Sequence, residues 1–103
     1  MIALHEVIND IEDEIKHAGE HLSCAVKLGH MVDLAALYVE SADEKIKRAE
    51  RFMSHKKSRI DGLRARGDES HKPICDLWAA RYPELIENID ELKFKVEQHK
   101  KRS

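Results

Sequence analysis

Apolar residues recur along most of the chain at steps of three and four, the spacing that places side chains on one face of a helix. The longest run lies between Met31 and Leu63, where only Lys56 interrupts an average spacing of three and a half residues. That spacing is typical of helices that pack through a narrow coiled-coil-like seam. Two further runs flank it. The sequence therefore predicts an all-α fold with three long helices, over about residues 2–28, 30–66 and 71–101.

Short breaks separate the three expected helices. Gly29 follows the first apolar stripe, and a polar stretch over 65–73 follows the second. Short connections make consecutive helices pack side by side in opposite directions, so we expect one antiparallel bundle domain over residues 1–103. Pro83 falls inside the third pattern, where it removes a backbone donor and clashes with the preceding turn. We therefore expect the third helix to be kinked or split at Pro83.

The expected second helix changes character along its length. Apolar residues over 31–42 cover most of its circumference, so we expect this first half to be buried on more than one side. Beyond Ala42 the apolar face narrows to the seam. At 1.5 Å per residue this helix is about 55 Å long and the first is about 40 Å long. Its far end must therefore project, or be covered by the third helix or by another chain.

This overhang predicts self-association, most simply as a homodimer that buries the seam. The expected interface residues are Met53, Ile60 and Leu63, together with Phe94, which lies off the seam of the third helix.

Composition narrows the class of protein only slightly. The 103 residues are 37% charged and 5% aromatic, with a net charge of −2, so no global attraction to nucleic acid or to an anionic membrane is expected. No stretch approaches 18 uncharged residues, which predicts that no segment spans a membrane. The N-terminus lacks a basic segment before an apolar run, and the two cysteines form no Cys-x-x-Cys pair. We therefore expect a cytoplasmic protein with reduced thiols.

Charge is sorted by segment. Residues 1–44 contain two basic and ten acidic residues, whereas 45–66 contain nine basic and two acidic. In an antiparallel pair, Asp10, Glu12 and Asp13 would lie beside 45–48 and neutralise that part. Five cations beyond the reach of the first helix offer an alternative function, a phosphate-binding surface for nucleic acid: Lys56, Lys57, Arg59, Arg64 and Arg66.

A second alternative is metal binding. Four side chains share one face of the first helix at steps of three, four and three, together with Asp10 one turn earlier: Glu14, His17, His21 and Cys24. Carboxylate, imidazole and thiolate groups bind zinc or a related divalent ion when they converge. The stripe lies at the edge of the apolar face, so a neighbouring helix would have to complete such a site. The plain alternative is a set of boundary residues on a charged helix, with no cofactor.

No Gly-rich phosphate loop, catalytic Ser-His-Asp order or local Cys-His signature is present. We therefore expect a non-enzymatic interaction or adaptor protein that self-associates and binds a protein partner.

Overall fold

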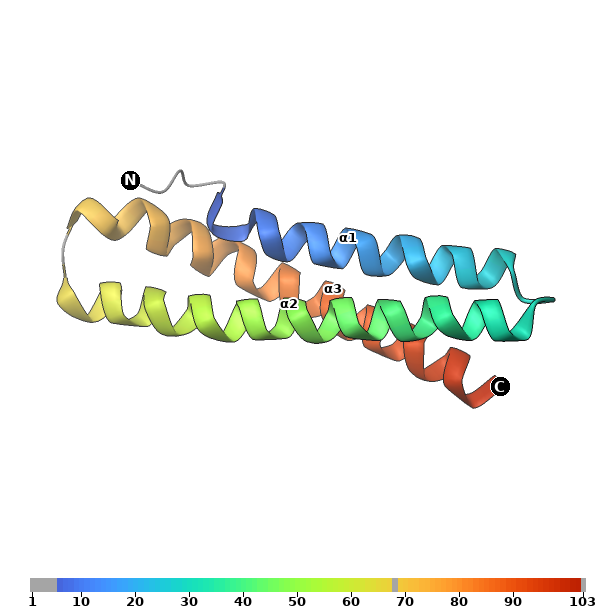
Figure 1. Cartoon of the computed structure of the whole chain (residues 1–103). Coiled ribbons are helices and arrows are strands. Elements are labelled where there is room, and N and C mark those ends of the chain that lie inside the picture. Colours follow the sequence, from blue (N-terminus) through green and yellow to red (C-terminus); the bar gives the residue numbers. More distant parts are fainter. Residues whose placement is uncertain (1–5, 68, 103) are drawn as a thin grey trace.

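The computed structural model describes residues 6–67 and 69–102, and nearly all of them are helical. The elements are α1 (Glu6–Lys27), α2 (Val32–Arg66), a single 3₁₀ turn η1 (Glu69–His71) and α3 (Lys72–Arg102). They form an elongated antiparallel bundle of 55 × 21 × 17 Å (Figure 1). The prediction of an all-α three-helix bundle is confirmed. The expected start of the first helix, at residues 2–5, lies outside the described residues.

Small side chains hold α1 and α2 together. Ala18 on α1 and Ala42 and Ala49 on α2 are completely buried, which lets the two backbones approach closely. Ile11 and Ile46 belong to the same core and are 0% and 1% exposed. The connecting turn over 28–31 is short, and the Met31 N–H donates a 2.8 Å hydrogen bond to the Leu28 carbonyl within it. The two stripes seen in the sequence therefore meet in one core.

The α2–α3 connection brings α3 back along the far end of α2. Gly67 ends α2 in the left-handed conformation (φ +67°), which glycine adopts without steric cost, and its N–H donates to the Arg64 carbonyl at 3.1 Å. α3 then covers the part of α2 that extends beyond α1 (Figure 1). Met53 and Ile60 are only 3% and 4% exposed, within the same buried cluster as Trp78. Of the three possibilities for this overhang, coverage by the third helix is the one observed.

α3 passes through Pro83 without interruption, so the helix is not split there. Pro83 lies on the exposed face of α3, as does Ala79, whose carbonyl loses its hydrogen-bond donor to the proline. Water can donate a hydrogen bond to that carbonyl on this exposed face, which explains why the helix tolerates the loss of one backbone hydrogen bond.

The first half of α2 is not buried on more than one side, and that prediction is wrong. α3 crosses α2 obliquely, and its C-terminal end emerges beyond α2 in the view of Figure 1, although residues as far as His99 still face the end of α1. The part of α2 nearest the α1–α2 turn therefore packs mainly on α1. Three large apolar residues at its start remain exposed: Val32, Leu34 and Leu37.

Within the described part of the chain, no helix is both long and apolar enough to cross a membrane.

Candidate functional site

The most distinctive surface of the molecule is apolar and surrounds the α1–α2 turn. We call it the apolar end and define it by Val26, Met31, Val32, Leu34 and Leu37. These side chains are between 40% and 67% exposed. Among the described residues, only one further large apolar side chain, Phe94, is exposed to this degree. The exposed apolar side chains are thus gathered at one end of the bundle instead of being scattered over it.

Two grooves open beside the apolar end, one on each side of the C-terminal part of α3. The larger, of about 430 Å³, lies between α2 and the end of α3 and is floored by small residues that include Ala25, Gly29 and Ala36. The smaller, of about 320 Å³, lies between α1 and α3. Val26 and His99 line both. The end of α3 therefore leaves space on the α1–α2 hairpin that none of the side chains described by the structure fills.

Charged groups frame the larger groove. Asp43 on α2 accepts contacts from Lys47 and from Lys100 of α3, each at 3.3 Å, and so ties the end of α3 to α2. Burial alone raises the pKa of Asp43, but the hydrogen bonds and charges of the two lysines outweigh burial and hold this pKa below its ordinary value. Asp33, Glu40 and Glu44 are exposed on α2 beside the apolar end. The rim of the apolar end on α2 is therefore acidic.

Residues of the candidate metal stripe are engaged by α2. Glu14 lies 3.5 Å from Arg48 and 3.8 Å from Lys45, so its carboxylate is neutralised by cations. The ring of His21 packs on Tyr38, with ring centroids 5.7 Å apart. His21 Nδ1 is buried and has no hydrogen-bond partner among the described residues.

His17, by contrast, is exposed, and Cys24 is half-buried. In the parts of the chain that the structure describes, no three His, Cys, Asp or Glu side chains converge closely enough to hold one ion. Metal binding by Glu14, His17, His21 and Cys24 stays a prediction.

The basic segment of α2 is partly neutralised within the chain. Lys56 was expected to lie beyond the reach of the first helix, and that is wrong, because its Nζ lies 2.7 Å from Asp10 Oδ1. Lys57 pairs with Asp61, one turn later in α2, at 3.3 Å. Arg59, Arg64 and Arg66 are exposed near the α2–α3 connection. The predicted nucleic-acid surface is therefore reduced to these three arginines and stays a prediction.

The structure places three of the four expected interface residues in or against the core of a single chain. Met53 and Ile60 are core residues of a single chain, and Leu63 is half-buried against that core. These three residues therefore do not form an exposed seam on α2. Phe94 is 64% exposed on the outer face of α3, between the buried positions Leu92 and Val96.

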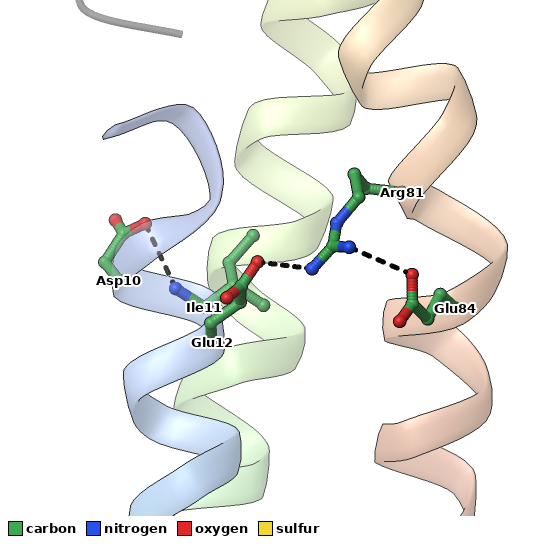
Figure 2. A network of polar contacts seen from close by, with 5 residues as sticks. All are labelled: Asp10, Ile11, Glu12, Arg81 and Glu84. Atoms are coloured by element: carbon green, nitrogen blue, oxygen red, sulfur yellow. Dashed lines mark hydrogen bonds and ion pairs between the residues drawn. The ribbon is translucent and has the colours of Figure 1, made fainter. Parts of the chain in front are cut away.

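A polar network that the sequence did not suggest ties α1 to α3. Arg81 donates a 2.8 Å hydrogen bond to Glu12 on α1, and it also lies 3.2 Å from Glu84 on its own helix (Figure 2). The hydrogen bond to Glu12 and the charges of both carboxylates raise the pKa of Arg81 above its ordinary value. Glu12 and Arg81 are 69 positions apart, so no local spacing rule relates them. The network orients α3 on α1.

The apolar end is the functional candidate that sequence reasoning missed, although its signal was present. Apolar residues surround the start of α2 on all sides, and such a helix is normally buried all round. The chain itself does not bury it. Comparison of the chain with protein-family models, with curated proteins and with solved structures finds no match, so the geometry of this end is the observation from which a function has to be argued.

Proposed function

We propose that the protein is a non-enzymatic interaction module and that the apolar end is the surface on which it docks another protein chain. The observation that carries this proposal is the clustering of five large, exposed apolar side chains over residues 26–37. Single exposed apolar residues are normal on a protein surface, whereas several gathered at one end are typical of a surface that binds a partner. Val32 lies on the face of α2 that lines the larger groove, and Leu34 and Leu37 lie on the opposite face.

The shape of this end supports docking of protein side chains. The larger groove is floored by alanine and glycine, so it accepts the side chain of a residue such as leucine from outside. Its volume of about 430 Å³ is open along one side instead of being enclosed. A helix that lays apolar side chains into a groove of this kind is a common mode of recognition.

Charges of both signs border the apolar end. Asp33, Glu40 and Glu44 are exposed on α2, whereas Lys95 and Lys100 line the two grooves from α3. A surface with no single sign of charge gives no electrostatic attraction to nucleic-acid phosphates or anionic lipid headgroups. Self-association belongs to the same proposal, and we place it at the apolar end because the Met53–Leu63 seam is covered by α3.

The expected affinity is moderate. Five side chains of this size, exposed to this extent, present apolar area of about 400–500 Å². Burial of that area and of a matching area on a partner is offset by the cost of association, about 4–15 kcal/mol. We therefore expect dissociation constants of about 1–100 µM.

A peptide titration tests the proposal. Two synthetic amphipathic helices carry leucine at heptad positions, one with lysine and one with glutamate on the remaining faces, and each is titrated into the protein by fluorescence anisotropy. We expect at least one to bind the native chain and to bind the Val32→Lys, Leu37→Lys double variant at least about tenfold more weakly. A chain that binds neither peptide and also remains monomeric would falsify the proposal.

A further inference from the structure

We infer that the outer face of the second half of α2 binds the phosphate backbone of a nucleic-acid duplex. This surface is separate from the apolar end, and the inference does not depend on the function proposed for that end. We call it the basic stripe and define it by Arg51, His55, Arg59 and Arg66, all of which are exposed. Three of the four are arginines, whose planar guanidinium group suits phosphate best among the cationic side chains.

The four side chains share one face of α2. Steps of four, four and seven residues keep them within about 80° of one another around a helix with about 3.6 residues per turn. From Arg51 to Arg66 they span about 22 Å along the helix axis. The major groove of a DNA duplex is about 12 Å wide, so a stripe of this length reaches phosphates on both sides of a groove.

The fold turns the acidic residues of this segment away from the basic stripe. Residues 45–66 contain two carboxylates, Glu50 and Asp61. Glu50 contacts Lys93 of α3 at 3.2 Å, so it lies on the side of α2 that faces α3. Asp61 follows at nearly the same angle around the helix and contacts Lys57 at 3.3 Å. The members of the basic stripe lie about 100–180° around the helix from Glu50.

The cations of the basic stripe are available to a ligand. Among the side chains that the structure describes, none of the four makes an ion pair or a hydrogen bond with another. The neighbouring cations on the edge towards α1 are engaged instead, Arg48 by Glu14 at 3.5 Å and Lys56 by Asp10 at 2.7 Å. The paired cations of α2 and the basic stripe are therefore different sets of residues.

Three exposed carboxylates border the ends of the basic stripe. Glu44 precedes it on α2, Asp13 of α1 lies opposite its start because the adjacent Glu14 contacts Arg48, and Glu69 follows it in η1. These carboxylates weaken the local attraction to phosphate. We therefore expect binding in the range of non-specific contacts, with a dissociation constant of about 1–100 µM at low salt.

The surroundings of the basic stripe favour a duplex over a membrane surface or a single strand. The exposed large apolar side chains of the described chain lie over 26–37 and at 94, so none accompanies the stripe. Attachment to a membrane surface uses apolar side chains beside the cations, and single strands stack their bases on exposed aromatic rings. Exposed Ser58 and Gly62 lie between the cations instead, and a Cβ at Gly62 would meet no atom within 4 Å. A phosphate backbone can therefore approach α2 closely here.

Fluorescence anisotropy of labelled DNA and RNA duplexes of about 20 base pairs, titrated with the full chain at several salt concentrations, is the test. With about three phosphate contacts, the logarithm of the affinity should fall with the logarithm of the salt concentration with a slope of about −2.7. The Arg59→Gln, Arg66→Gln double variant is expected to bind at least about tenfold more weakly and to lose about 1.8 of this slope.

The matched control is the Lys95→Gln, Lys101→Gln double variant. It removes the same charge from exposed positions at the C-terminal end of α3, away from the basic stripe. We expect its affinity to stay within about twofold of the native value, because it removes no phosphate contact. Circular dichroism checks that each variant is folded, since glutamine has nearly the helix propensity of arginine and lysine. Arg51→Gln, His55→Gln is a second variant of the stripe, also expected to weaken binding.

Four outcomes overturn the inference. One is the absence of binding to either duplex at about 0.05 M sodium chloride. Another is an equal loss of affinity in the control and in the Arg59→Gln, Arg66→Gln variant, because total charge would then govern binding. The third is tighter binding to a single strand of the same sequence. The last is binding to phosphatidylserine vesicles without binding to a duplex, which would assign the basic stripe to a membrane surface.

Discussion

Asp10 of α1 and Lys56 of α2 form an ion pair with 2.7 Å between Oδ1 and Nζ, although 46 positions separate them. The charge pattern predicted Asp10 beside residues 45–48, about two helical turns away. Side chains lean towards the N-terminus of their own helix, so in an antiparallel pair Asp10 and Lys56 lean towards each other. Glu14 occupies the expected position instead, next to Lys45 and Arg48. This offset decides which cations of α2 are neutralised.

A double-mutant cycle on Asp10→Asn and Lys56→Gln measures the strength of this pair. We expect a coupling free energy of about 0.5–1 kcal/mol in urea unfolding, because the lysine side chain is largely buried. The exposed pair Lys57–Asp61 is the control, with an expected coupling of about 0.3–0.5 kcal/mol. Additive effects of the two substitutions would show that the pair does not set the helix register.

Two identical substitutions, Leu85→Ala and Leu37→Ala, test the division between the core and the apolar end. Leu85 is 2% exposed, so its truncation leaves a cavity and should lower the free energy of unfolding by about 2–4 kcal/mol. Leu37 is 60% exposed, so its truncation should change that free energy by less than about 0.5 kcal/mol. Both are measured by urea unfolding at a protein concentration low enough to keep the chain monomeric. Equal losses would contradict the exposed position of Leu37.

The ion pairs of Asp43 predict a pH dependence of stability. Its folded-state pKa lies below the ordinary value of 3.8, because Lys47 and Lys100 outweigh the opposing effect of burial. Ionised Asp43 therefore stabilises the fold above the unfolded-state pKa, and this contribution is lost as the pH falls through the folded-state pKa.

We expect Asp43→Asn to lower the free energy of unfolding by about 0.5–1 kcal/mol at neutral pH. The difference from the native chain should shrink as the pH falls below 3.8. Urea unfolding across this pH range measures it. A difference that grows on acidification contradicts the lowered pKa.

Replacement of Pro83 should strengthen α3. Pro83→Ala restores a backbone donor to the Ala79 carbonyl at an exposed position inside a continuous helix, so we expect a gain of about 1–3 kcal/mol in the free energy of unfolding. Thermal unfolding checks this, with the exposed change Glu87→Ala in the same helix as a control. A loss of stability would show instead that the proline is needed for the path of α3 across α2.

The helices of this protein follow from its sequence alone. Apolar spacing, the breaks at Gly29 and Gly67 and the absence of a strand pattern are local features, and local features determine helix type and approximate length. The buried stripe of α1 could be predicted for the same reason. Ile11, Ala18 and Leu22 all lie in the core.

Only the tertiary structure decided which apolar residues are covered. When each helix is considered alone, the sequence predicts an uncovered seam from Met53 to Leu63 and a buried start of α2. α3 begins next to the far end of α2 and crosses α2 obliquely, so it buries Met53 and Ile60 and leaves Val32 and Leu37 exposed. Crossing geometry depends on the packing of all three helices at once, and no spacing within one helix encodes it. For that physical reason, the surface from which a function is proposed is the apolar end and not the seam.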